Sequence, residues 1–340
     1  MRRSLALVAI PLITGLALAG CGSSSSSKST TGASGSASST STASGNGSSE
    51  VTASGAFNKS PTVTIPKAKA SSSLVVKTLI TGSGTALTST DAFLGNYVVY
   101  SWDGTTHTLK GSTYGAGSTP TLFSTPLLPG LTSALTGAKV GSRVLAVIPP
   151  KDGFGTSGNT QDGISGTTTL VFVIDVLKAY PGTEGATGST VGHGGGDLPT
   201  VTEPTAAGTA PTVTMPSSKV KPPKTLQVQT LIKGSGAKIA AGDYVVVQYV
   251  GYIWRTGKTF DSSWSRKTPF GFEIGAQPAQ VITGWDTGLR GVTVGSRVML
   301  VIPPSDGYGT TGASQAGITG TDTLVFVVDV IDAYSATASS

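Results

Sequence analysis

The sequence predicts an α+β protein made of two copies of one unit, each a curled antiparallel β-sheet wrapped around one short α-helix. Two observations support this fold class: apolar runs of strand length recur along the chain, and they recur in the same order in both halves. PTVTIP from Pro61 returns as PTVTMP from Pro211, and IPPKDGFGT from Ile148 returns as IPPSDGYGT from Ile302. Such internal repetition indicates two domains of one fold.

The second copy shows the predicted elements most clearly. Its strands are runs rich in Val, Ile and Tyr, bounded by Gly, Pro and Asp: YVVVQYVGY from Tyr244, SRVMLVIP from Ser296 and TLVFVVDVI from Thr323. The one helix candidate runs from about Gly284 to Arg290, because Ile282, Trp285 and Leu289 fall on one helical face. A sheet that wraps a single short helix is an α+β arrangement.

Residues 1–21 have the pattern of an export signal. A basic start is followed by about 15 mostly apolar residues, fewer than the roughly 20 that a membrane-spanning helix needs. The run ends in Leu-Ala-Gly-Cys at Cys21, which resembles the lipobox of bacterial lipoproteins. Cys21 is the only cysteine, so we expect it to carry a lipid that anchors the protein to the outer face of the bacterial cytoplasmic membrane, in the cell envelope.

The composition divides the remaining chain into segments. Residues 22–60, rich in Ser, Thr, Gly and Ala, are predicted to be a flexible tether, and residues 182–210 a linker between domains. The two domains are then residues 61–181 and 211–334, and residues 335–340 form a tail. The net charge of +6 comes from scattered single residues, so no nucleic-acid partner is expected.

The order of motifs in the second copy carries a family resemblance. These motifs are YVG at Tyr249, FDSS at Phe260, RKTPF at Arg266, VITGWD at Val281, VGSRV at Val294, IPPSDGYG at Ile302 and TLVF at Thr323. In this order and spacing the block from about Pro211 to Tyr334 resembles the FKBP-type peptidyl-prolyl cis-trans isomerases. The resemblance implies that a proline ring of a polypeptide substrate is buried against aromatic walls.

The resemblance also implies roles for individual residues. Trp285 is the floor of the pocket, Phe260 belongs to its lining, Asp261 lies at its polar edge, and the Tyr308 hydroxyl donates to a substrate carbonyl. We count these four as the catalytic set. The expected substrate-binding residues are Tyr249, Arg266, Phe270, Val281, Ile282, Ile318 and Phe326.

The chemistry needs no nucleophile, metal or cofactor. Twisting an X-Pro bond breaks amide resonance, and the resulting barrier is about 18–20 kcal/mol. Water favours the planar amide, whose carbonyl oxygen carries charge, whereas a dry aromatic pocket favours the twisted form. We therefore expect a monomeric folding catalyst whose partners are unfolded, proline-containing polypeptides. A non-catalytic chaperone or envelope assembly factor that grips proline or apolar segments is the alternative.

The first copy departs from the family pattern. Aligned on the shared flanks, Trp102 matches Tyr249, Leu131 matches Trp285 and Phe154 matches Tyr308, while Leu109–Ser112 replaces FDSS. Losing the tryptophan floor and the tyrosine hydroxyl predicts a domain that folds but catalyses poorly.

Two other signals are set aside. The G-x-G-x-x-G strings at Gly153 and Gly307 each follow a Pro-Pro pair, which does not suit a dinucleotide site at the start of a helix. His107 and His193 are too isolated for a metal site.

Overall fold

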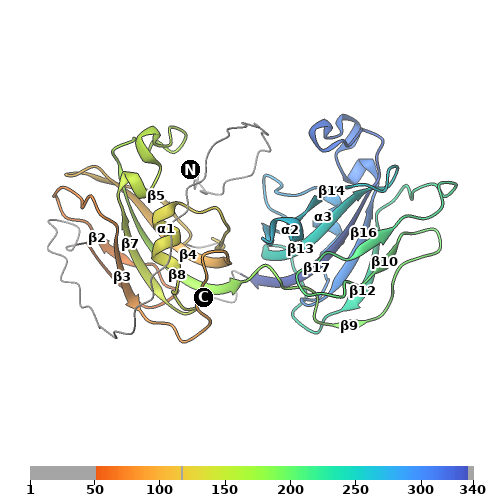
Figure 1. The fold of residues 1–340 in the computed structure, drawn as a ribbon, viewed down its shortest axis with the longest axis horizontal. Coiled ribbons are helices and arrows are strands. Elements are labelled where there is room, and N and C mark those ends of the chain that lie inside the picture. Colours follow the sequence, from red (N-terminus) through yellow and green to blue (C-terminus); the bar gives the residue numbers. More distant parts are fainter. Residues whose placement is uncertain (1–50, 116–117, 336–340) are drawn as a thin grey trace, which may run out of the picture.

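The computed structural model describes residues 51–115 and 118–335, which form two domains, each with its own antiparallel sheet (Figure 1). The predicted signal segment with Cys21, the tether up to residue 50 and the tail from residue 336 lie outside the described residues. Among the described residues, no helix is long and apolar enough to cross a membrane.

The first domain has a sheet with the strand order β3-β7-β8-β4-β5, and β6 also pairs with β4. Its strands are β3 (Val75–Ile80), β4 (Ala92–Trp102), β5 (His107–Ser112), β6 (Thr121–Phe123), β7 (Arg143–Ile148) and β8 (Thr169–Tyr180). Helix α1 (Pro129–Leu135) packs on this sheet, and the short 3₁₀ turns η2 (Pro150–Asp152) and η3 (Gly155–Ser157) follow β7.

The second domain repeats this plan with the order β14-β13-β17-β16-β12-β9, and β15 also pairs with β13. Its strands are β9 (Ser189–Thr190), β12 (Gln227–Lys233), β13 (Asp243–Ile253), β14 (Thr259–Ser262), β15 (Phe270–Glu273), β16 (Arg297–Ile302) and β17 (Leu324–Ser335). The helices are α2 (Ser263–Arg266) and α3 (Thr283–Gly288), followed by η4 (Pro304–Asp306), η5 (Gly309–Thr311) and η6 (Ser314–Ala316).

The predicted fold class is confirmed, and the short helix lies where the sequence places it. The structure adds α2, a single helical turn that the sequence pattern does not reveal. In both domains one helical glycine touches the sheet: a Cβ built on Gly130 would lie 2.5 Å from Ile148, and one on Gly284 would lie 2.5 Å from Ile302. Each helix therefore presses its backbone directly onto the sheet.

A small hairpin covers the opposite face of each sheet. In the first domain β1 (Thr52–Ser54) pairs with β2 (Thr62–Thr64), and in the second β10 (Thr200–Thr202) pairs with β11 (Thr212–Thr214). The first hairpin packs over Leu145, Val147 and neighbours, and the second over Met299, Val301 and neighbours. Burial on both faces explains why β7 and β16 are continuous apolar runs instead of alternating ones.

These hairpins change the limits of the two domains. Residues 51–60 of the predicted tether belong to the first hairpin, and Val51 is fully buried. Within the predicted linker, β9 pairs with β12, and Val201 of β10 is buried in the second domain. The short connection near Pro181 is therefore what separates the two domains.

A buried arginine ties each hairpin to its sheet. Arg143 pairs with Asp175 at 2.7 Å and donates to the carbonyls of Gly55 at 3.0 Å and Lys59 at 2.6 Å. In the second domain Arg297 pairs with Asp329 at 2.6 Å and also with Glu203 of the segment after β10. The arginine thus neutralises a buried aspartate and satisfies polar groups of the covering segment at the same time.

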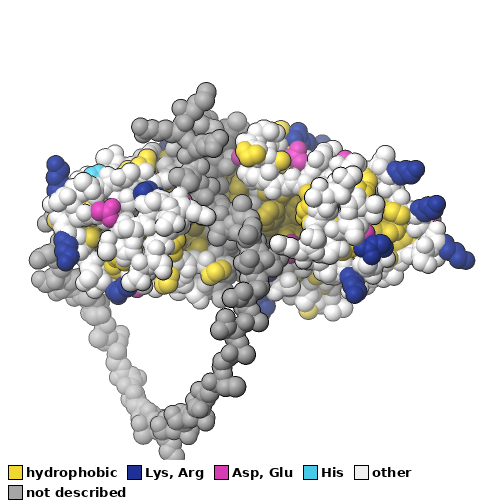
Figure 2. Space-filling model, turned by 90° about the horizontal axis from the view of Figure 1, so that it is seen from above, with side chains coloured by type: hydrophobic (Ala, Val, Ile, Leu, Met, Phe, Trp, Pro, Cys, Tyr) yellow, Lys and Arg dark blue, Asp and Glu magenta, His cyan; other side chains and the backbone are white. Residues whose placement is uncertain are grey.

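The two domains touch where β8 and β17 end. Leu94 and Tyr180 of the first domain and Val246 of the second lie in one apolar cluster, and the Tyr180 hydroxyl donates to Asp332 at 2.6 Å. Leu122 donates its backbone N–H to the Tyr244 hydroxyl at 3.3 Å. In Figure 1 this junction lies at the lower middle of the view. On the face seen in Figure 2, Lys and Arg side chains form separate patches, in line with the scattered single charges of the sequence.

Replacing Arg297 by Met should destabilise the second domain by about 3–5 kcal/mol, because Asp329 would remain as an unpaired buried charge. Replacing both Arg297 and Asp329 with apolar residues should cost less than the single change. Urea unfolding of the three proteins tests this, and an equal or larger loss in the double variant would contradict it.

Glu184, in the connection between the domains, should make stability depend on pH. Burial raises its pKa to about 7, Lys178 opposes the shift, and Asp332 and Asp91 add to it. A raised acid pKa penalises the folded state as pH rises from about 4.3 towards 7. After discounting for its partial exposure, Glu184→Gln should add about 1 kcal/mol at pH 8 and nothing at pH 4. Thermal unfolding at both pH values measures this; an equal shift at both would contradict it.

Candidate active site

The second domain brings the predicted aromatic residues into one cluster around Trp285. The centroid of the Trp285 ring lies 5.0 Å from the ring centroid of Tyr249, 5.1 Å from that of Phe326 and 6.2 Å from that of Phe270. Each pair meets edge-on. Phe260 meets Phe326 edge-on at 5.5 Å. Val281 and Ile282, just before α3, pack against the same cluster and are only partly buried. The aromatic side chains come from β13, β14, β15, β17 and α3, so four strands and one helix of the second domain contribute to this site.

Two members of the cluster were not predicted. Phe272 on β15 lies 5.6 Å from Trp285, behind the pocket. Gly251 on β13 leaves the space that two rings fill, since a Cβ built there would lie 2.7 Å from Phe260 and 2.8 Å from Phe326. The signal for Gly251 was present in the YVG motif, because a glycine inside a strand often marks the close approach of other atoms.

Burial of the Trp285 indole N–H costs free energy of folding. Trp285 is 4% exposed, and its Nε1 is buried without a hydrogen-bond partner among the described residues. An unpaired buried donor costs about 1–3 kcal/mol. A tryptophan kept only for packing would normally have this donor satisfied. The cost therefore favours a role for the indole surface in the pocket.

Asp261, Tyr249 and Arg266 form a polar edge. The Tyr249 hydroxyl and Arg266 both donate to the Asp261 carboxylate, and Arg266 Nη2 also donates to the Tyr249 hydroxyl at 3.0 Å. Burial raises the pKa of Tyr249, and the neighbouring Asp261 raises it further, so the phenol stays protonated and acts as a donor. The carboxylate is held in one orientation from two sides.

Local sequence explains how this edge is built. Ser262 is the N-cap of α2 and accepts from the Ser265 N–H at 3.4 Å, while the Ser263 hydroxyl accepts from the Tyr249 N–H at 2.7 Å. The single turn of α2 brings Arg266 back towards Asp261 on β14. The two serines of the FDSS motif therefore position its acid and the arginine that pairs with it.

Tyr308 and Ile318 lie on the loop after β16. Ile318 is 3% exposed and belongs to the aromatic cluster, whereas Tyr308 is 40% exposed. Burial of part of the ring, together with the charge of Asp261, raises the pKa of Tyr308. No described residue forms a hydrogen bond with its hydroxyl, so this donor is available to a bound molecule.

The first domain keeps the scaffold but differs from the second at many of the matched site positions. Strand pairing corrects the sequence alignment: Tyr97, opposite Ile174, takes the place of Tyr249, opposite Val328. Tyr97 even repeats the Tyr249 contact, donating its N–H to Thr113 at 2.8 Å. Trp102 instead lies on the other face of the sheet, under the first hairpin. The flank alignment was wrong by five residues, because short shared strings do not show which residues of the two strands have equivalent partners.

The FDSS replacement also shifts by one residue. Gly111 pairs with Val99 as Asp261 pairs with Gly251, so glycine stands in place of the acid and Lys110 in place of Phe260. Lys110 Nζ donates to the carbonyls of Asp162 and Gly163, each at 3.1 Å. The lysine therefore spans from β5 to the loop that corresponds to the Tyr308–Ile318 loop.

The remaining matches agree with the prediction. Leu131 occupies the Trp285 position on the helix, next to Gly130, and Phe154 the Tyr308 position. Thr121 pairs with Gly95 as Phe270 pairs with Val247, so a further wall is missing. Besides Tyr97, Phe172 and Ile164 keep the type of residue found at Phe326 and Ile318.

Comparison with known proteins decides the family. The model of the FKBP-type peptidyl-prolyl cis-trans isomerases matches residues 89–177 and 236–331. The chain belongs to this family. An FK506-binding protein of Streptomyces anulatus is 43% identical over 111 residues, which are 33% of this chain and 88% of the relative.

Further relatives match one or more FKBP domains. A probable FK506-binding protein of Corynebacterium glutamicum is 40% identical over 33% of this chain and 89% of its own length. The crystal structure of the three FKBP domains of wheat FKBP73 is 21% identical, with a TM-score of 0.30, over 77% of this chain and 95% of that structure. As a member of this family, the protein is a peptidyl-prolyl cis-trans isomerase that binds proline-containing polypeptides.

Gly251→Ala should damage the pocket while leaving the fold intact. The new methyl would displace Phe260 or Phe326, and overpacking of this kind costs about 1–3 kcal/mol of folding stability. Because the displaced rings line the pocket, we expect isomerase kcat/KM to fall about tenfold. The control is Gly192→Ala, whose methyl would meet nothing closer than 3.6 Å. Unchanged kcat/KM in the Gly251 variant would show that the two rings do not need their present positions.

Proposed function

We propose that the second domain carries the isomerase activity and that the first domain contributes little turnover. The observation that carries this proposal is the contrast between matched positions in one chain. The second domain has the Trp285 floor, the Asp261 edge and the Tyr308 hydroxyl, where the first has Leu131, Gly111 and Phe154. Lys110 also takes the place of an aromatic wall.

The geometry suits catalysis by preferential binding of the twisted amide. A proline ring packed on Trp285 and between Tyr249 and Phe326 would place the preceding carbonyl among apolar rings. Water that stabilises the charged oxygen of the planar amide is then excluded, so the planar state loses stabilisation relative to the twisted state. An acceleration of about 10⁴-fold to 10⁶-fold requires roughly 5–8 kcal/mol of such preference.

The polar residues orient the substrate at the edge of the pocket. Tyr308 supplies a free hydroxyl donor on the rim, suited to a substrate carbonyl. Asp261 cannot swing into the pocket, because Tyr249 and Arg266 hold it. None of these groups has to gain or lose a proton during the bond rotation, so the rate should depend little on pH near neutrality.

The cellular role follows from the predicted N-terminus. The lipobox-like segment at Cys21 and the Ser/Gly-rich residues after it support a protein anchored to the outer face of the bacterial cytoplasmic membrane. Folding limited by X-Pro isomerisation takes tens to hundreds of seconds without a catalyst. We propose that the protein, as a monomer, assists the folding of exported polypeptides in the cell envelope.

Substitutions that copy the first domain into the second should test the assignment. In a proline-limited refolding assay with the full chain, Trp285→Leu should lower kcat/KM about 10-fold to 100-fold, because it removes several ring contacts from the floor. Tyr308→Phe should lower it less. Residues before Pro211 pack on the second domain, so the full chain is the appropriate protein.

The matched control is Phe154→Tyr in the first domain, which should leave the rate unchanged. Equal losses from Leu131→Ala and Trp285→Leu would overturn the assignment to the second domain. Binding of proline peptides without any acceleration of refolding would favour a non-catalytic chaperone or assembly factor.

A further inference from the structure

Beside the aromatic cluster of the second domain lies a cavity of about 230 Å³. The two share Val281, which packs on the aromatic cluster and also lines this cavity. Its other walls come from the end of β15, the loop before α3 and the exposed side of α3, and they include Glu273, Gly275, Ala276, Ala279, Asp286 and Arg290. Since one water needs roughly 10–15 Å³ of such space, a long side chain fits here.

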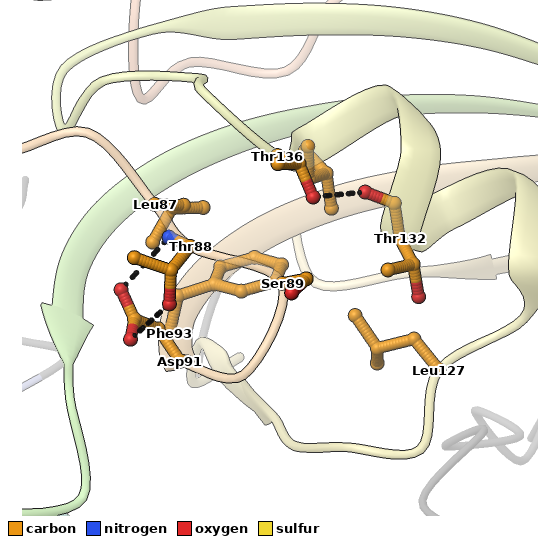
Figure 3. Close-up of a pocket in the computed structure, with 9 residues that line it drawn as sticks. Leu87, Thr88, Ser89, Asp91, Phe93, Leu127, Thr132 and Thr136 are labelled. Atoms are coloured by element: carbon orange, nitrogen blue, oxygen red, sulfur yellow. Dashed lines mark hydrogen bonds between the residues drawn. The ribbon is translucent and has the colours of Figure 1, made fainter. Parts of the chain in front are cut away.

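The first domain has only a remnant at the matching helix face. Thr132 and Thr136 stand where the second domain has Asp286 and Arg290, and Thr136 donates to the Thr132 carbonyl at 2.7 Å. Figure 3 shows Phe93 and Leu127 beside them, and the space left there is about 10 Å³. Gly284 lies 12 positions after Phe272, whereas Gly130 lies 7 positions after Phe123, so the longer loop builds the cavity.

The side chains that line the cavity carry more negative than positive charge. Asp286 is satisfied, because it pairs with Arg290 at 2.6 Å and accepts from the Gly275 N–H at 2.5 Å. Glu273 has no cationic partner among the described residues; its carboxylate accepts only from Thr119 of the first domain, at 3.4 Å. Glu273 therefore leaves one uncompensated negative charge in the wall. Ala276, Ala279 and Val281 supply apolar surface next to it.

We propose that this cavity binds a Lys or Arg side chain of the substrate that lies close in sequence to the isomerised proline. Such a side chain has an aliphatic stem that covers apolar surface and a charged end that needs a polar partner. The stem lies along Ala276 and Ala279, and the charged end meets Glu273. An extended chain advances about 3.3–3.6 Å per residue, so a residue one or two positions from the proline reaches across Val281.

This inference rests on the proposed function, and it gives the first domain a part in that function. Thr119 contacts Glu273, and Leu122 donates to the hydroxyl of Tyr244, whose strand pairs with β15 at Glu273. The cavity wall that carries the charge is therefore held by contacts from both domains. At the matching helix face of the first domain the space is only about 10 Å³.

The test uses the full chain and a set of proline peptides that differ at one flanking residue. The peptides carry Lys, Gln or Glu at each of the two positions before and after proline, and kcat/KM is measured by NMR exchange. At one position the Lys peptide should exceed the Gln peptide by about fivefold, as expected for a partly exposed ion pair. Glu273→Gln should bring this ratio close to one, and Glu273→Lys should favour the Glu peptide.

Asp197→Asn is the matched control, because Asp197 is an exposed acid elsewhere in the second domain. It should keep the preference for Lys. Turnover of the Gln peptides without a Lys preference, or a preference that survives in both Glu273 variants, would overturn this inference alone. Failure of the protein to turn over any peptide would overturn the proposed function and this inference with it.

Discussion

The contact between a helical glycine and the sheet is the constraint on which the site depends. Gly284 lets the backbone of α3 rest against Ile302, and Trp285, the next residue, is thereby carried down among rings from three strands. A side chain at Gly284 would separate helix and sheet and lift the indole away from Tyr249 and Phe326. Close packing of this kind leaves few places to absorb a change of even one methyl group.

The first domain shows that the contact between the helical glycine and the sheet does not depend on the residues at the pocket positions. Gly130 makes the same approach to Ile148, and the sheet, hairpin and buried arginine are all repeated. Yet the residue after the glycine is Leu131, and Val99 fills the space that Gly251 leaves open. The scaffold is thus maintained by contacts that do not involve the pocket, so pocket residues can change without loss of the fold.

The sequence predicted the scaffold well, because strand runs and ordered motifs are local signals. The motifs also named the aromatic residues that the fold gathers around Trp285, whose roles stay a prediction. The failures came where geometry depends on partners distant in sequence. The string Tyr-Val-Val occurs at Tyr97 and at Tyr244, but strand pairing makes Tyr97 the equivalent of Tyr249, so the match of Trp102 with Tyr249 was wrong.

The linker and the tether are predictions from composition, and composition does not show whether a segment pairs as a strand. Val51 and Val201 are isolated apolar residues in polar segments, and each becomes buried only when its hairpin meets the sheet. Phe272 escaped notice for a similar reason. It lies on a short strand whose pairing with β13 brings it to Trp285, and no periodicity can be seen in four residues.

The first domain and the connection after it stabilise strands of the second domain. Gln248, beside Tyr249 on β13, donates to the carbonyl of Gly182 at 3.1 Å and accepts from Ser263, whose hydroxyl in turn accepts from the Tyr249 N–H. The first residues after the first domain are therefore bonded to the framework of the active site, and Asp332 takes bonds from Tyr180 and Lys178. Through these contacts the first domain stabilises the strands that hold the aromatic cluster of the second, and this effect does not depend on the residues at its own matched positions.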